Sequence, residues 1–279
     1  MTSPWRSAGA RLKAVLGGTL AAADLQAAPP AAFRPAKPAP PTIAGTWKLL
    51  WQDEFDGDSL DRIWHPCQYW DHDHTIVGHG ELQAFDASAS AVAHSMLSIT
   101  CREDAQYGHG TKYVSGLAMT GGERDAPHSP KFSFLHGYVE VRAKIPTGSG
   151  LWPAVWLMPA SYHDSAGEID VLEVLGETPT KAYFTTHRKG REQHDVTGVD
   201  LSLDFHTYGV DWQPTHLHWY LDGKRVATCA DLSRVCEEAM YPVLSLAVDD
   251  GTVWGAAPNA DTKFPAVMQV DYIRIWQTE

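Results

Sequence analysis

The chain has 279 residues, of which 44% are hydrophobic and 20% are charged, and this ordinary globular composition excludes disordered, collagen-like and fibrous classes. Its formal net charge is -12, so the chain lacks the excess of basic residues on which nucleic-acid binding depends. No stretch reaches the roughly 18 to 20 consecutive apolar residues of a membrane span. We therefore expect a globular protein that neither binds nucleic acid nor crosses a membrane.

The first 28 residues have the order of a secretory signal, because basic residues precede a short apolar run at 14–23 and small residues follow. A disordered leader is the alternative. Residues 29–43 are rich in Ala and Pro, a composition that builds no core and favours a semi-rigid tether. We predict a leader over 1–28, a linker over 29–43 and one folded domain over 44–279, in a secreted or extracytoplasmic, monomeric protein.

A candidate metal site comes next along the chain, in Asp71-His72-Asp73-His74, where one aspartate separates the two histidines. On a strand this spacing would place two imidazoles on one side for a metal ion. The sequence offers no evident third ligand, and the surroundings resemble a turn. A solvated loop is therefore the favoured interpretation.

The dominant period after residue 44 is two, which is typical of β-strands. Residues 139–145 alternate apolar and charged without error, and Asp222-Gly223 separates two alternating runs as the turn of a hairpin. Helical periodicity is confined to one or two turns at 233–239. Short strands are predicted at 96–100, 139–145, 216–221, 224–226, 244–248 and 268–276. Many short strands between Gly, Pro and Asp turns indicate an all-β sandwich or barrel.

The chain contains four cysteines, Cys67, Cys101, Cys229 and Cys236, with no CxxC pair. A zinc ribbon and a thioredoxin-like site are therefore excluded. Cys229 and Cys236 are the only two that are close in sequence. Either a disulfide between them or free thiols are compatible with this spacing.

Three acids, Glu168, Asp170 and Glu173, fall within six residues of otherwise apolar sequence. On a helix they would point to 0°, about 200° and about 140°, so no face would collect them. On a regular strand Glu173 would point into the core, where an unpaired carboxylate is costly. A β-bulge at Val171 or Leu172 would return Glu173 to the side of the other two acids.

With the bulge, the Cα atoms of Glu168 and Glu173 would lie about 13 Å apart at roughly 3.3 Å per step. Their carboxyl groups could then approach the roughly 5 to 5.5 Å that a retaining glycosidase needs. Asp170 between them would raise the pKa of a neighbour by like-charge repulsion. The competing interpretation is a solvated polar strand face, which is the usual meaning of an acidic cluster.

Motifs along the chain decide between these two interpretations, because together they resemble glycoside hydrolase family 16, the laminarinase and lichenase family, in its ExDxxE branch. The resemblance covers about residues 47–277 in family order. The motifs that carry it are Trp51-Gln52-Asp53-Glu54-Phe55-Asp56, Gly80-Glu81-Leu82-Gln83, the segment 134–159, Phe205-His206-Thr207-Tyr208-Gly209-Val210-Asp211-Trp212 and Val270-Asp271-Tyr272-Ile273-Arg274-Ile275. The resemblance implies a β-jelly-roll sandwich of two antiparallel sheets with a concave substrate cleft.

The resemblance also implies roles for individual residues. Glu168 matches the nucleophile, Glu173 the general acid/base and Asp170 the assisting carboxylate. Asp271 matches a position that often helps to hold a structural calcium ion away from the cleft, whereas catalysis requires no cofactor. Substrate-binding positions are matched by Trp152, Trp156, His187, Glu81 and Trp254. For the two tryptophans of the 134–159 segment core packing is the alternative, and we expect at least one of them in the core.

Two segments depart from the family pattern. Residues 162–166 stand where the family often has Trp-Pro before the Gly-Glu pair, and Asp249-Asp250 stands where many members have Gly-Gly. Both segments should border the cleft, so they bear on substrate preference rather than on the chemistry.

The sequence therefore predicts an endo-acting retaining hydrolase of a β-linked polysaccharide, a β-1,3- or β-1,3/1,4-glucan. A glycanase for a bacterial exopolysaccharide or a galactan, and a transglycosylase, remain alternatives within the same chemistry. A non-catalytic carbohydrate-binding jelly roll is the alternative from another class. Retention of all three acids argues against it.

Overall fold

The computed structural model describes residues 43–66, 80–108, 110–122, 126, 129–161 and 167–279. The predicted leader, nearly all of the linker, the His72–His74 motif and the divergent segment 162–166 lie outside the described residues. Within them the chain is almost entirely β, and the only helical elements are two short 3-10 turns, η2 (Ala87–Ala89) and η3 (Leu232–Arg234). No helix among the described residues has both the length and the apolarity that crossing a membrane requires.

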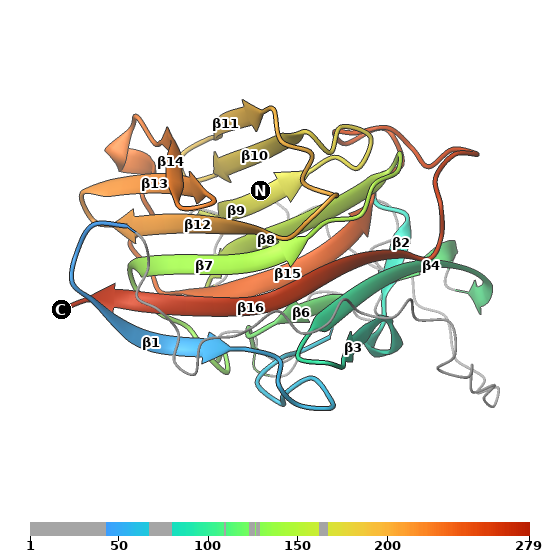
Figure 1. The fold of residues 1–279 in the computed structure, drawn as a ribbon, viewed down its shortest axis with the longest axis horizontal. Helices are drawn as coiled ribbons and strands as arrows, with labels where there is room; N and C mark the ends of the chain where they lie inside the picture. Colours follow the sequence, from blue (N-terminus) through green and yellow to red (C-terminus); the bar gives the residue numbers. More distant parts are fainter. Residues whose placement is uncertain (1–42, 67–79, 109, 123–125, 127–128, 162–166) are drawn as a thin grey trace, which may run out of the picture. The chain divides into compact units, whose positions relative to one another are not determined.

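The strands form two sheets that lie face to face (Figure 1). The ten-stranded sheet has the order β14-β13-β12-β7-β16-β4-β5-β2, with β1 added at β16 and β3 at β4. Its strands are β1 (Trp47–Asp53), β2 (Gln83–Phe85), β3 (Ser90–Val92), β4 (Leu97–Gly108), β5 (Thr111–Ser115), β7 (Gly137–Lys144), β12 (His206–Gln213), β13 (His216–Leu221), β14 (Lys224–Thr228) and β16 (Ala266–Thr278). Pairing is antiparallel except between β2 and β5, which are parallel over three residues.

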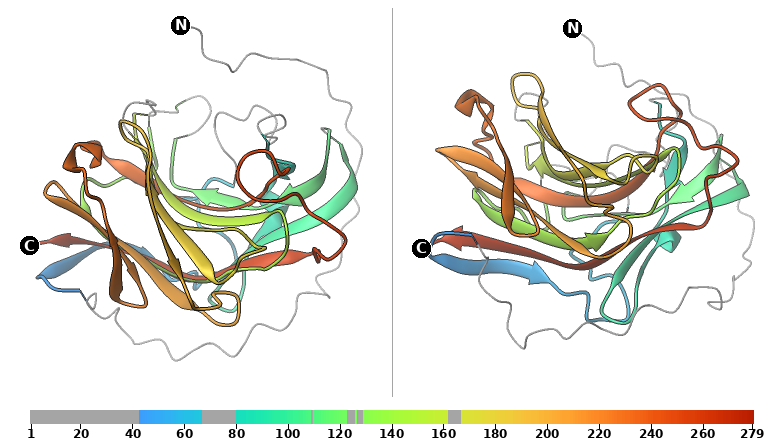
Figure 2. Two further views of the ribbon diagram at one scale, coloured as in Figure 1. Left: turned by 90° about the horizontal axis from the view of Figure 1, so that it is seen from above. Right: turned by 45° about the horizontal axis from the view of Figure 1, so that its top comes forward.

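The second sheet has six strands in the order β11-β10-β9-β8-β15-β6, all antiparallel. They are β6 (Leu117–Met119), β8 (Leu151–Pro159), β9 (Ile169–Val174), β10 (Lys181–Thr186), β11 (Glu192–Thr197) and β15 (Met240–Val248). Both sheets bend, and the six-stranded sheet lies on the inner side of the bend (Figure 2). We refer to its outward-facing surface as the concave face.

The main core fills the space between the sheets, because alternate apolar side chains of both point inward. From β8 it receives Leu151, Val155 and Leu157, and from the facing sheet Val139 and Val141 of β7, all fully buried or nearly so. The expected two-sheet jelly-roll sandwich is confirmed.

The predicted strands are confirmed, although most are longer than the apolar runs that predicted them. Asp222 and Gly223 have φ values of 48° and 71°, as a type I′ turn between β13 and β14 requires. The charged face of β7 is less exposed than its alternation suggested. Glu140 is buried because the hydroxyl groups of Tyr138 and Tyr272 donate to it at 3.0 and 2.9 Å.

The structure also decides between a disulfide and free thiols for Cys229 and Cys236. Cys229 is a free thiol whose Sγ lies 3.3 Å from the carbonyl oxygen of Asp231. The disulfide between Cys229 and Cys236 is therefore not formed.

Candidate active site

The acid-bearing strand β9 contains the predicted bulge. On the β8 side Leu172 pairs with Val155 and Asp170 pairs with Trp156, so Val171 has no partner of its own. Val171 and Leu172 both belong to the core. Because two successive residues point inward, Asp170 and Glu173 both face away from the core on the concave face. The sequence prediction of a bulge at Val171 or Leu172 is confirmed.

Backbone contacts fix the ends of the acid segment. Glu168 immediately precedes β9, and its carbonyl oxygen accepts the backbone N–H of His187 at 3.0 Å. Behind the strand, the indole N–H of Trp219 donates to the carbonyl oxygen of Asp170 at 2.8 Å. The first bond places His187 beside the acids, and the second holds β9 against the ten-stranded sheet.

His187 lies between two of the carboxylates. Its Nε2 atom is 3.1 Å from Oδ2 of Asp170 and 3.5 Å from Oε1 of Glu168. The side chain of Asp170 is only 3% exposed, whereas those of Glu168 and His187 are 31% and 38% exposed. Solvent, and a substrate, can therefore reach Glu168 and His187, while Asp170 acts from beneath them.

Glu173 receives two hydrogen bonds from neighbouring strands. The hydroxyl group of Thr185 on β10 donates to its Oε2, and the indole N–H of Trp152 on β8 donates to its Oε1, each at 3.2 Å. Thr185 is fully buried, so it contacts the acids but not solvent. These two donors orient the Glu173 carboxyl group on the concave face.

Burial and mutual repulsion raise the pKa of all three acids. Burial and the charge of Asp170 raise the pKa of Glu168 to about 8, and burial and the charge of Glu168 raise the pKa of Glu173 to about 7. Burial and the charge of Glu173 raise the pKa of Asp170 as well. The cluster therefore retains protons near neutral pH, as a site with a carboxylic acid for proton donation requires.

An aromatic group borders the acids. The ring of Trp254 lies 5.5 Å from that of Trp152 and 4.5 Å from that of Tyr183, in edge-to-face arrangements. The guanidinium group of Arg191 lies 5.4 Å from the Trp254 ring centre. The structure therefore brings Trp152, His187 and Trp254 together with the three acids.

The other two predicted substrate residues are Trp156, which is the cross-strand neighbour of Asp170, and Glu81. Trp156 is half-buried on the concave face, where its indole N–H donates to Ser245 at 3.2 Å. Trp156 points away from the space between the sheets but packs against a second cluster of buried side chains that includes Met119 and Tyr241, so core packing is observed for this one of the two tryptophans. Glu81 pairs through its backbone with Asp249 at the end of β15 and accepts a hydrogen bond from Gln83. Burial raises the pKa of Glu81.

Sequence reasoning missed Thr185, Tyr183 and Arg191. Thr185 and Tyr183 alternate on one face of β10, and the antiparallel register places them opposite Asp170 and Glu173. Alternation in Ala182-Tyr183-Phe184-Thr185 was a usable signal for a strand. This alternation did not show which strand β10 would pair with.

Metal binding finds little support in this site. Glu168, Asp170 and His187 are the only group found within the described part of the chain whose potential metal-ligating atoms all lie within 4.8 Å of one another. Their contacts with one another account for this closeness, and we assign no metal there. At Asp271, where the resemblance implies a structural calcium ion, a cationic side chain contacts one carboxylate oxygen, and the calcium ion stays a prediction. The guanidinium group of Arg142 lies 2.8 Å from Oδ2 of Asp271 and supplies the positive charge that a cation would bring.

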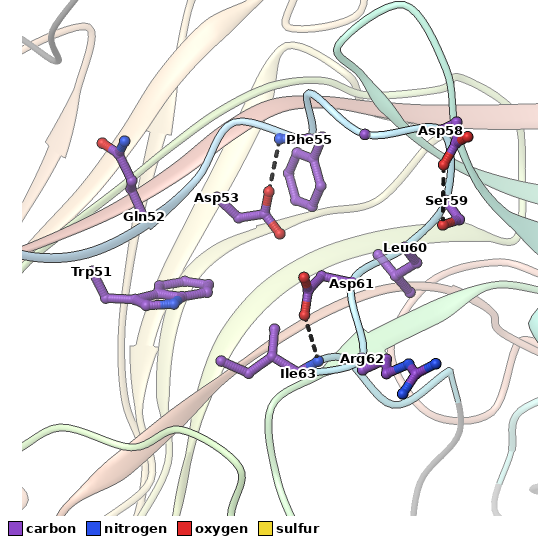
Figure 3. Close-up of a pocket in the computed structure, with 11 residues that line it drawn as sticks. Trp51, Gln52, Asp53, Phe55, Asp58, Ser59, Leu60, Asp61, Arg62 and Ile63 are labelled. Carbon is purple, nitrogen blue, oxygen red and sulfur yellow. Dashed lines mark hydrogen bonds between the residues drawn. The ribbon is translucent and has the colours of Figure 1, made fainter.

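A pocket of about 630 Å³ lies next to β1 and the loop that follows it (Figure 3). None of its lining residues belongs to the acid cluster. Two of its carboxylates accept hydrogen bonds from nearby residues. Asp53 accepts the backbone N–H of Phe55 and the indole N–H of Trp64, each at 2.7 Å, and Asp61 accepts the backbone N–H of Ile63 at 2.9 Å. These bonds shape the loop at the sheet edge, and we assign the pocket no part in the chemistry.

Comparison with known proteins agrees with this geometry. Residues 89–274 match the family model described as glycosyl hydrolases family 16. The chain is 31% identical to "Glucan endo-1,3-beta-glucosidase A1" of Niallia circulans, over 87% of this chain but only 39% of that longer protein. It is 30% identical to "Glucan endo-1,3-beta-glucosidase" of Cryptopygus antarcticus, over 83% of this chain and 93% of that one.

Solved structures give the same result. The catalytic domain of an endo-1,3-beta-glucanase (laminarinase) from Thermotoga petrophila RKU-1 is similar with a TM-score of 0.73 and 27% identity. The similarity covers 85% of this chain and 100% of that domain. Fold, acid geometry and sequence match thus agree that this chain belongs to glycosyl hydrolase family 16.

Proposed function

We propose that the protein is an endo-acting, retaining hydrolase of β-1,3- or β-1,3/1,4-glucan. The observation that carries the proposal is the bulge in β9, which turns Glu173 onto the face that also holds Asp170, beside Glu168. A binding protein needs no such arrangement of three partly protonated acids. The relatives named as glucan endo-1,3-beta-glucosidases support the substrate class.

In the proposed mechanism Glu168 attacks the anomeric carbon while Glu173 protonates the glycosidic oxygen. Glu173 then removes a proton from the water molecule that hydrolyses the glycosyl-enzyme. Glu168 must be ionised to attack, although its surroundings favour protonation. The hydrogen bond between Glu168 and Asp170 raises the pKa of Glu168 and lowers that of Asp170, so Glu168 holds the proton that the two share. The reactive form is therefore the fraction of the enzyme in which Glu168 is ionised and Glu173 is protonated.

The nucleophile assignment is tested with Glu168→Gln. Loss of the nucleophile should lower kcat on the order of 10³-fold or more, while oligosaccharide binding and the far-UV spectrum stay close to wild type. Glu103→Gln is a matched control, since Glu103 is half-exposed on β4 and pairs with Lys112 outside the acid cluster. Near-normal turnover of Glu168→Gln would reject the assignment.

Azide separates the two glutamate roles. With an activated β-glucoside, azide bound in the space vacated in Glu168→Ala should attack directly and give the α-glycosyl azide. In Glu173→Ala the glycosyl-enzyme still forms, and azide should then give the β-glycosyl azide. Proton NMR of the anomeric centre distinguishes the products. The reverse outcome would exchange the two assignments.

The substrate is tested with a panel of laminarin, lichenan and agarose. Release of short β-glucan oligosaccharides from the first two, with a β-anomer formed first, is expected for an endo-acting retaining glucanase. Cleavage of agarose alone would favour the galactanase alternative, and products longer than the starting oligosaccharide would indicate transglycosylation. We further propose that the protein acts outside the cytoplasm, since its polymeric substrate would be found there.

A further inference from the structure

A buried carboxylate holds the loop that carries Trp254. Asp249 at the end of β15 is only 1% exposed. Its Oδ1 atom accepts the backbone N–H of Gly251 at 2.7 Å, and its Oδ2 atom accepts those of Trp254 and Gly255 at 2.9 and 2.8 Å. Charge-assisted bonds of this kind are about twice as strong as neutral ones.

A second carboxylate holds the far side of the same loop. Oε1 of Glu177 accepts the backbone N–H of Ala256 at 2.8 Å, and the hydroxyl group of Ser149 donates to the carbonyl oxygen of Ala257 at 2.8 Å. A Cβ atom on Gly255 would lie 2.9 Å from Glu177 Oε1, so a larger residue there would shift the Glu177 carboxylate. The loop is thus fixed at several successive peptide groups.

The base of the loop is tied to the segment that carries Glu81. The backbone N–H of Asp250 donates to the carbonyl oxygen of Gly80, and that of Leu82 donates to the carbonyl oxygen of Val248, each at 2.8 Å. Glu81 and Asp249 pair directly between these two bonds. Asp249 therefore connects the Trp254 loop both to the end of β15 and to the segment that carries Glu81.

What the loop presents to the site is the indole of Trp254. This ring packs edge-to-face on Trp152, whose N–H donates to Glu173. A continuous set of contacts therefore leads from the Asp249 carboxylate through Trp254 and Trp152 to the proposed acid/base. An indole edge or face held beside the acids suits contact with a sugar ring.

We propose that Asp249 is a positioning residue for substrate binding. Its carboxylate preorganises loop 250–256 so that Trp254 is already in place when a glucan chain enters, and it acts through Trp254 rather than by touching the sugar. The inference rests on the proposed function, because its kinetic effect requires glucan turnover.

The kinetic test compares Asp249→Ala and Asp249→Asn with wild type on laminarin oligosaccharides. Losing the preorganised loop should raise KM about 3- to 10-fold for Asp249→Ala, with kcat within about twofold. Asp249→Asn keeps one accepting oxygen and should give a smaller rise. Asp200→Ala is a matched control, because Asp200 accepts the backbone N–H of Ser202 at 3.1 Å in a loop between β11 and β12. A fall in kcat with unchanged KM would overturn the proposal.

A double-mutant cycle tests whether Asp249 acts through Trp254. The KM effect of Asp249→Asn should disappear when Trp254 is already alanine, because the positioned group is gone. An undiminished effect in the Trp254→Ala background would overturn the proposal.

Hydrogen exchange tests the anchor without any turnover. The amides of Gly251, Trp254 and Gly255 should exchange at least about tenfold faster in Asp249→Asn than in wild type, with no change in the amides of β9. Unaltered exchange at these three amides would refute the anchor itself. If wild type hydrolyses no glucan, the proposed function fails while this measurement still decides the role of Asp249. If Asp249→Ala does not fold, Asp249→Asn alone carries the kinetic test.

Discussion

Replacing Thr185 by valine removes a hydrogen bond to Glu173 at nearly constant side-chain volume. The Thr185 hydroxyl group donates to Oε2 of Glu173 at 3.2 Å and lowers the pKa of this carboxyl group by stabilising its ionised form. In Thr185→Val the pKa of Glu173 should therefore rise. Since Glu173 must be protonated to act as the general acid, the basic limb of kcat/KM should move to higher pH.

The size of the shift follows from the geometry. A bond at 3.2 Å is long for a charge-assisted hydrogen bond, so the low range of about 0.5 to 1.5 kcal/mol applies. At 1.36 kcal/mol per pH unit this corresponds to a rise of about 0.4 to 1 unit in the pKa of Glu173 above its wild-type value of about 7. Thr185 is fully buried, so no lost sugar contact contributes to the change.

The assay is kcat/KM on a laminarin oligosaccharide from pH 4 to 9. The adjacent Thr186→Val is the matched control, because Thr186 is equally buried but donates to the carbonyl oxygen of Arg234 at 3.1 Å. Both variants lose one hydroxyl group from the same strand, and only Thr185→Val should move the basic limb. An unchanged limb in Thr185→Val, or an equal shift in Thr186→Val, would refute the assignment of Glu173 as the acid.

Three further outcomes are expected. His187 lowers the pKa of Glu168 and Glu173, so His187→Asn should move both limbs of the kcat/KM profile to higher pH, and a shift of the basic limb alone would contradict the contact with Glu168. Because the folded-state pKa of Glu168 is about 8 against an ordinary 4.5, its contribution to stability is complete below pH 4.5 and is lost as the pH rises to 8. Thermal denaturation should accordingly show Glu168→Gln gaining stability over wild type between pH 5 and 8, by about 2 to 4 °C for each kcal/mol, and a constant difference would contradict the raised pKa. Arg274 forms two bonds to Glu54 at 2.7 and 2.9 Å with little exposure, so Arg274→Ala should cost about 3 kcal/mol in urea denaturation, and a cost below about 1 kcal/mol would show the pair to be structurally unimportant.

Local patterns predicted the strands because they depend on neighbouring residues. Alternation at 139–145 and the Asp222-Gly223 turn identify β7 and the β13–β14 hairpin, since side-chain period and positive φ are properties of short segments. The bulge was predictable for the same reason. Its signal is the odd offset between Asp170 and Glu173, together with the cost of burying a carboxylate.

Contacts between distant strands were not predictable in this way. Thr185 reaches Glu173 only because β10 pairs with β9 in one particular register. Glu140 looked solvent-exposed by alternation, yet the hydroxyl groups of Tyr138 and Tyr272 cover it, and Tyr272 lies 132 residues away. From the sequence, Asp249 was only a departure from the family pattern in a segment expected to border the cleft. Its role as a loop anchor is visible only in the structure, where the backbone N–H groups of 251–255 surround its carboxylate.

The bulge in β9 determines which side chains of β10 lie beside the acids, as well as the alignment of the acids themselves. Because Val171 and Leu172 both enter the core, β10 needs a single residue, Phe184, between the partners of Glu173 and Asp170. Tyr183 and Thr185 therefore flank Phe184 on the concave face, opposite Glu173 and Asp170. A buried threonine at this position reaches Glu173 by a hydrogen bond and lowers the pKa of both acids. In a regular strand the same threonine would face at most one of them, so the extra residue in β9 both aligns the acids and couples their protonation.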